Sequence, residues 1–285
     1  LKQHVAIDAC VLHRVNPGGV LTSLVHHDDI VLRTRVLRAA GEMARLDLRS
    51  QCERYLADQD INCRFWAAWA AVLLGNRTSA LHVLNIFAGS RNPLQQIALQ
   101  LVLKVISMTE AHELLKNLAM DVANMRSLIV GAGIAGDPFY IPWLIKQMDD
   151  PKRARLAGES FSFITGLDLA YLDLEKDAPE GAEVGPDEDP EKDNVQMDKD
   201  DNLPWPDSAK IQAWWDSNKT NFVDGKRYFM GRLVSREHCM LVLKEGFQRQ
   251  RIAATQYLTL LNPEMSLFPT NAPAWRQQRW LSSLS

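Results

Sequence analysis

The stretch DINCRFWAAWAAVLLGN, residues 60–76, carries the pattern that decides the fold. Its large apolar residues recur at the spacing of one face of an α-helix. They are Phe65, Trp69, Val72 and Leu73. Alanines fill much of the rest, and Gly75 stands where such a helix would end. The stretch therefore predicts a helix that packs closely against a neighbour and stops at a glycine.

The same pattern recurs through residues 1–172 with a period of about 31, which is typical of a repeat array. The first column of equivalent residues is Lys2, Arg33, Arg64, Gln95, Arg126 and Arg155. The closing positions are Ala44, Gly75, Ile106, Gly136 and Gly166. A third, apolar column contains Val25, Leu56, Phe87, Leu118 and Met148. Gly, Pro and Asn residues divide each period into two helical segments, and stacking of such hairpins would supply the core.

The units DINCRFWAAWAAVLLGN (60–76) and DDPKRARLAGESFSFITG (149–166) resemble HEAT repeats, in particular the short bacterial kind named after phycobilin lyases. The resemblance covers residues 1–172 and is less regular where Gln95 and Ile106 replace the usual Arg and Gly. It implies an all-α fold, an α-solenoid (α-α superhelix) of five to seven HEAT-like hairpins. The segment IQAWWDSNKTNFVDGKRYFMGR (211–232) is similar to the tail of an uncharacterised bacterial HEAT-repeat family associated with type VI secretion gene clusters.

Charge divides the chain into three parts. Residues 173–207 contain fourteen acidic side chains and three lysines, whereas the other 250 residues carry a net charge of +8. The expected organisation is a repeat array over 1–172, a mobile acidic loop over 173–207 and a Trp-rich helical cap over 208–285. Within the cap we expect a helix from Ser208 to Lys219, followed by two helices between Glu237 and Leu261 that meet near Gly246.

The segment LIVGAGIAGDPF, residues 128–139, contains the G-x-G-x-x-G pattern of dinucleotide-binding proteins. A phosphate-binding helix would have to continue through Gly136, but Asp137 and Pro138 follow at once. In the repeat register Gly136 is a closing glycine. We therefore interpret Gly131 and Gly133 as close-packing positions of a helix and expect no nucleotide cofactor.

Other chemical motifs are weak in this sequence. His26, His27, Asp28 and Asp29 are consecutive, yet neighbouring residues point in different directions, so we expect no metal site. Instead, Asp28 or Asp29 should cap the next helix, and the histidines should be solvated. A di-iron HEAT enzyme would repeat its His-Glu pairs, whereas only His112-Glu113 occurs. The enzymatic alternatives are a HEAT-like DNA glycosylase and a bilin-lyase-like activity, neither of which has a local motif here.

The best surface candidate follows from the repeat. The residues two positions before the apolar column are Arg54, Asn85, Lys116 and Lys146, and the neighbouring column contributes Gln51, His82, Glu113 and Trp143. If the second helices line a concave face, these side chains form a polar, largely basic ridge that suits an acidic protein partner. The alternative is an ordinary solvated helix face. We further expect the acidic segment to fold over this ridge and compete with the partner.

The arginine column has a structural interpretation. Arg33, Arg64, Arg126 and Arg155 would pair with Asp29, Asp60, Asp121 and Asp150 as a ladder between repeats. The sequence as a whole favours a non-enzymatic protein-interaction scaffold without cofactor or metal, and it disfavours nucleic acid as the partner. Four scattered cysteines and the lack of a membrane span or export signal favour the cytoplasm. Because the first residue is Leu1 and not Met, we expect a fragment of a longer chain.

Overall fold

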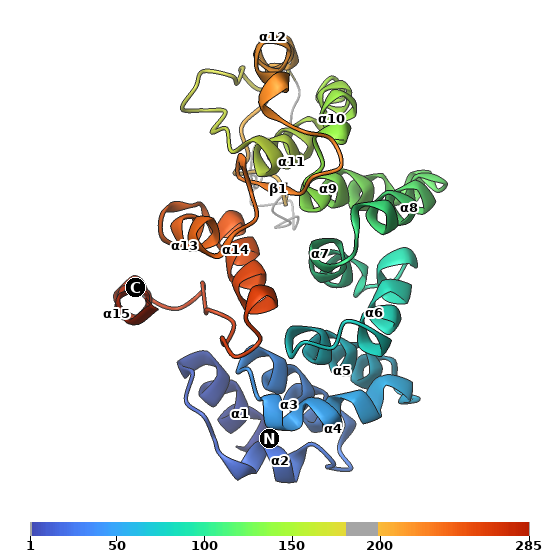
Figure 1. Ribbon diagram of the computed structural model, residues 1–285, viewed down its shortest axis with the longest axis vertical. Coiled ribbons are helices and arrows are strands. Elements are labelled where there is room, and N and C mark those ends of the chain that lie inside the picture. The colour runs from blue at the N-terminus through green and yellow to red at the C-terminus, as the bar shows by residue number, and fades with distance from the viewer. Residues whose placement is uncertain (1, 181–198, 285) are drawn as a thin grey trace, which may run out of the picture. The chain divides into compact units, whose positions relative to one another are not determined.

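The protein is all-α and built from stacked helical hairpins, as the repeat predicts (Figure 1). The computed structural model describes residues 2–180 and 199–284, so the middle of the predicted acidic loop, residues 181–198, lies outside the described residues. The chain forms two compact units, the first from residues 1–106 and 234–285 and the second from residues 107–233. No helix in the described parts of the chain has the length and apolar character needed to cross a membrane.

Within its described residues, unit 1 contains seven helices before residue 107 and three after residue 233. The early helices are α1 (Lys2–His13), α2 (Gly19–Leu24), α3 (Ile30–Glu42), α4 (Arg49–Arg54), α5 (Ile61–Leu73), α6 (Ser79–Gly89) and α7 (Gln95–Val105), with 3-10 turns η1 (Leu46–Leu48) and η2 (Tyr55–Ala57). The late helices are α13 (Arg236–Glu245), α14 (Gln248–Leu261) and α15 (Ala274–Leu284).

Unit 2 continues the repeats and adds a short strand pair. Its helices are α8 (Met108–Ala119), α9 (Met125–Ala135), α10 (Ile141–Gln147), α11 (Ala154–Thr165) and α12 (Ser208–Asn218). Its 3-10 turns are η3 (Val122–Asn124), η4 (Pro138–Tyr140) and η5 (Lys219–Asn221). Strands β1 (Tyr228–Phe229) and β2 (Arg232–Leu233) pair antiparallel.

The helix ends follow the sequence signals. Asp29 and Asp60 cap α3 and α5, because their carboxylates accept hydrogen bonds from backbone N–H groups of the first turn. The three closing glycines have positive φ angles, 97° at Gly75, 73° at Gly136 and 77° at Gly166. Ala44, at the same repeat position, also has a positive φ of 51°. The predicted equivalence therefore holds at these four positions, whereas Ile106 follows its helix in an extended conformation, with φ of −66° and ψ of 158°.

Small residues bring the first helices of successive repeats into close contact, as predicted for Gly133. A Cβ at Gly133 of α9 would lie 2.9 Å from the Cα of Ser160 on α11. Gly41 of α3 plays the same part against α5, since a Cβ there would lie 2.8 Å from the Cα of Ala70. The G-x-G-x-x-G stretch is consequently the end of a packed helix, with Gly131 and Gly133 inside α9 and Gly136 at its C-cap.

The C-terminal region predicted as one cap, residues 208–285, is divided between the two units. Helix α12 packs its Trp215 into the core of unit 2, whereas α14 contacts α5 and α7 of unit 1. Arg77 donates a hydrogen bond of 3.0 Å to the carbonyl of Leu260 at the end of α14. The expected helices near 208–219 and 237–261 are present. The tryptophans of the region are divided as well, since Trp214 and Trp215 lie on α12 of unit 2 and Trp275 and Trp280 lie on α15 of unit 1.

The short strand pair of unit 2 lies against the C-terminal ends of α9 and α11. The N–H of Tyr228 donates to the carbonyl of Gly136 at 2.8 Å, and the N–H of Met230 donates to the carbonyl of Phe163 at 2.7 Å. This segment thereby satisfies carbonyls at the C-terminal ends of α9 and α11, which a helix leaves without partners. The two closing glycines make the approach feasible, because a Cβ at Gly136 would overlap the Tyr228 carbonyl.

Candidate functional site on helices α8 and α10

The second helices of unit 2 present the most distinctive surface of the described chain. Helix α8 begins with a capping box, in which the Ser107 hydroxyl and the Glu110 carboxylate each accept a backbone N–H of the other residue. Its apolar side faces the core through Leu114, Leu115 and Leu118. Residues at positions 112 and 116 are one helical turn apart, so they lie on the same side of α8.

A histidine and an aspartate connect α8 to the next helical turn. The carboxylate of Asp137 is fully buried, with 0% exposure, and its Oδ2 lies 2.8 Å from Nε2 of His112. The backbone N–H groups of Phe139 and Gly225 also donate to this carboxylate, at 3.0 and 2.9 Å. Asp137 thus caps the turn η4 that begins at Pro138, and in addition it fixes an imidazole and the loop around Gly225.

An exposed aromatic ring lies on this histidine. The Phe139 ring stacks on the His112 imidazole with centroids 5.3 Å apart and planes inclined by 28°. Tyr140 contacts both rings edge-on, each at 5.3 Å. Burial, together with the Asp137 carboxylate, raises the pKa of Tyr140 to about 12. Phe139 remains 58% exposed, so a large apolar ring is held in one orientation at the surface.

The predicted ridge residues are distributed over the two units. Arg54, His82 and Asn85 are exposed on α4 and α6 of unit 1, and Lys116 and Lys146 are exposed on α8 and α10 of unit 2. Trp143 is half-buried and packs against the core of unit 2. The ridge as a binding surface stays a prediction. Sequence reasoning singled out neither His112 nor Phe139 for binding, although the Asp-Pro capping signal at 137–138 marks the turn that positions them.

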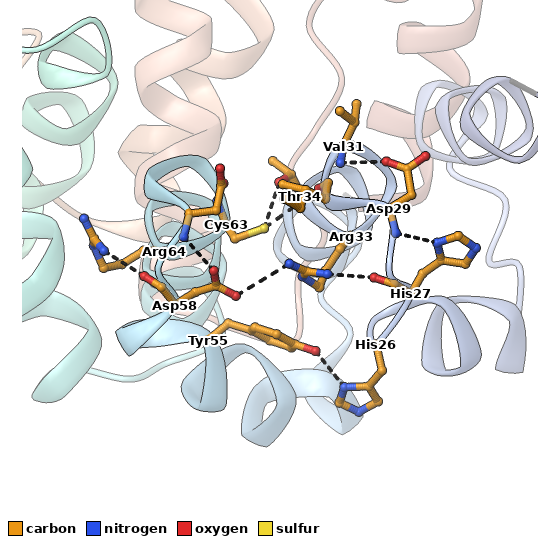
Figure 2. A network of polar contacts seen from close by, with 12 residues as sticks. His26, His27, Asp29, Val31, Arg33, Thr34, Tyr55, Asp58, Cys63 and Arg64 are labelled. Atoms are coloured by element: carbon orange, nitrogen blue, oxygen red, sulfur yellow. Dashed lines mark hydrogen bonds and ion pairs between the residues drawn. The ribbon is translucent and has the colours of Figure 1, made fainter.

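His26, His27 and Asp29 take part in a network of polar contacts (Figure 2). Nδ1 of His26 lies 2.8 Å from the Tyr55 hydroxyl, and Nδ1 of His27 accepts the backbone N–H of Asp29 at 3.0 Å. In the described part of the chain, no group of three or more His, Cys, Asp or Glu side chains is arranged to hold a metal ion. Of the two candidate caps, Asp28 and Asp29, it is Asp29 that caps α3.

The predicted ladder of arginines and capping aspartates is wrong. In unit 1, Arg33 and Arg64 both turn to Asp58, Arg33 through the carboxylate at 3.8 Å and Arg64 through the backbone carbonyl at 2.7 Å (Figure 2). The capping aspartates use their oxygens on backbone N–H groups, as Asp60 does for Cys63. In unit 2, Arg126 and Arg155 contact residues 200 and 201 of the acidic segment.

The cysteine thiols differ in accessibility, and this gives a first prediction. Burial raises the pKa of Cys52 and Cys239 to about 12, and Cys63 is buried against the Thr34 hydroxyl at 3.1 Å. Cys10 is only half-buried. Because the thiolate is the reactive form, we expect DTNB to titrate Cys10 in the native protein and the other three only after unfolding. Cys10→Ser should abolish the native reaction; a remaining fast thiol would contradict these burials.

No protein-family model, curated protein or solved structure matches this chain.

Proposed function

We propose that the chain is a helical-repeat scaffold of the HEAT type that it resembles, and that it binds another protein through its second helices. The observation that carries this proposal is the fixed, exposed ring of Phe139. Aromatic residues that are rigid before binding bury much apolar area at little cost in side-chain entropy, which is why they dominate protein interfaces. Phe139 is rigid, because His112 and Tyr140 hold its ring, and it offers apolar area for burial, because more than half of the residue is exposed.

The exposed lysines of the two second helices favour an acidic partner. Lys116 lies one turn after His112 on α8, and Lys146 lies one turn after Pro142 on α10. Both lysines are exposed, so their ammonium groups are available to carboxylates at the rim of an interface. Rim charges accelerate association and select the partner, while the central aromatic provides affinity. Arg54, His82 and Asn85 would extend the same function to the second helices of unit 1.

A crosslinking experiment followed by affinity measurement tests the proposal. A photoreactive phenylalanine analogue at position 142 should crosslink the partner in cells, and the purified partner can then be titrated. We expect Phe139→Ala to weaken binding at least about tenfold, because a central aromatic typically contributes more than about 1.4 kcal/mol. Lys116→Glu with Lys146→Glu should mainly slow association with an acidic partner.

The matched controls lie in the same unit. Tyr171 is 85% exposed outside α8 and α10, and Lys152 is an exposed lysine in the turn before α11. Tyr171→Ala and Lys152→Glu should leave affinity and association rate as in the wild type. If Phe139→Ala binds like the wild type while remaining folded, the surface on α8 and α10 is not the binding site.

A further inference from the structure

The end of the acidic segment is bound to the first helices of unit 2 through two arginines. Both Nη atoms of Arg126 on α9 lie 2.7 Å from the two carboxylate oxygens of Asp200, a bidentate pair. The Asp200 residue is only 6% exposed. On α11, the Arg155 guanidinium lies 3.9 Å from the Asp201 carboxylate and 4.7 Å from the centre of the Trp205 ring. The segment is therefore held by charge and by stacking together.

Backbone pairing and a proline complete this contact. The N–H of Lys176 donates to the carbonyl of Trp205, and the N–H of Asp207 donates to the carbonyl of Leu174, both at 2.8 Å. Pro206 lies against α11, where a Cβ at Gly158 would be 3.3 Å from its ring. An extended peptide that adds itself to an exposed backbone edge while its side chains enter specific contacts is a common mode of peptide recognition.

The same repeat position is used differently in unit 1. There Arg33 and Arg64 each donate to a carbonyl six residues earlier in the chain, at 2.7 Å in both cases, and so brace their own repeat turns. Arg126 and Arg155 reach a distant part of the sequence, 74 residues away in the case of Arg126 and Asp200. A bidentate guanidinium and carboxylate pair recognises the shape of the acid as well as its charge.

We propose that Arg126 and Arg155, with the backbone edge at Leu174–Lys176, form a binding site for acidic peptides. The ligand is a protein segment that carries two acidic residues followed by a Trp-Pro pair. Residues 200–207, which read DDNLPWPD, occupy this site within their own chain and so act as an internal competitor. The site combines side chains of α9 and α11 with this backbone edge, and its contacts are separate from those of Phe139, which lies in η4 and stacks on His112 of α8.

A labelled peptide with the sequence KDDNLPWPD, residues 199–207, tests the site by fluorescence anisotropy on the full chain. In the wild type the tethered segment competes at an effective concentration of about millimolar, so the peptide should bind weakly. Replacing Asp200 and Asp201 with alanine weakens the competitor, and affinity for the peptide should rise at least about tenfold. Arg126→Glu in that background should abolish binding. Binding should also weaken between about 0.05 M and 0.5 M salt, because the partly exposed pairs are screened.

Controls separate this inference from loss of folding and from the proposed function. Asp200→Asn with Asp201→Asn keeps the shape of both side chains and removes only their charge. This variant should show the same rise in peptide affinity, and it replaces the alanine variant if that one does not fold. Asp47, an exposed acid that pairs with Arg45 in unit 1, provides the matched control, and Asp47→Ala should bind like the wild type. Phe139→Ala should not change peptide affinity. Equal peptide affinity in the wild type and the folded Asp200, Asp201 variants, or none in either, would overturn the proposal.

Discussion

Gly133→Leu is expected to unfold unit 2 at a much lower urea concentration than the wild type. The added side chain would begin 2.9 Å from the Cα and Cβ of Ser160, where neither backbone can give way without separating α9 from α11. These helices contribute Ile129 and Phe161 to the core of the unit. Overpacking of a core costs about 1–3 kcal/mol and more where backbone must move, against a typical total stability of about 5–15 kcal/mol.

Urea titration followed by circular dichroism and tryptophan fluorescence measures this effect. Trp214 and Trp215 of α12 lie at the core of unit 2 and report on it directly. Gly19→Leu is the control, because nothing lies within 4 Å of a Cβ at this helical glycine. Its unfolding midpoint should stay close to that of the wild type. Similar losses in both variants would show that close packing at Gly133 is not the cause.

Asp137→Ala is the second change with a large expected effect. It would leave the N–H groups of Phe139 and Gly225 and the His112 imidazole without their buried acceptor. Each hydrogen bond to this charged acceptor contributes about 1.5–3 kcal/mol, and the three donors are partly exposed and can turn to water, so we expect a loss of about 3–5 kcal/mol in the free energy of unfolding. The Phe139 ring should also lose its fixed position, which links this stability effect to the proposed binding surface.

Amide hydrogen exchange tests the local part of this prediction. Protection at Phe139 and Gly225 should fall in Asp137→Ala, while the amides of α14 in unit 1 retain theirs. Asp137→Asn keeps one carbonyl acceptor and should lose less stability than the alanine variant. His112→Ala removes the imidazole alone and should leave the two backbone hydrogen bonds in place. Equal losses in all three variants would contradict the assigned role of the carboxylate.

The repeat period was sufficient to predict the helices and their ends, because both depend on residues close in sequence. Asp60 caps its helix and Gly75 closes it within one unit, so their spacing carries the information. Local patterns also predicted helix α12 and the α13–α14 hairpin. Contacts between distant segments leave no such periodic signal.

The partners of the arginine column could not be predicted from the repeat. Arg64 and Arg126 occupy equivalent positions, yet one turns to a carbonyl six residues earlier and the other to Asp200, 74 residues later. A guanidinium donates hydrogen bonds to the oxygens that the tertiary structure brings near it, and sequence spacing does not determine which oxygens these are. For the same reason His112 and Asp137 could be assigned separately, one as a helix residue and the other as a cap, but not as a pair.

Unit 1 is formed by two separate stretches of the chain, residues 1–106 and 234–285, and this affects how it folds during synthesis. Helix α14, which covers part of α5 and α7, ends near Leu260, 183 residues after its hydrogen-bond partner Arg77. At about 5–20 residues per second, a ribosome needs about 10–40 s to synthesise that stretch. During this interval the nascent chain exposes the apolar side of early repeats that have already formed. Ribosome-associated chaperones that bind apolar surface therefore have a defined window in which to act on this protein.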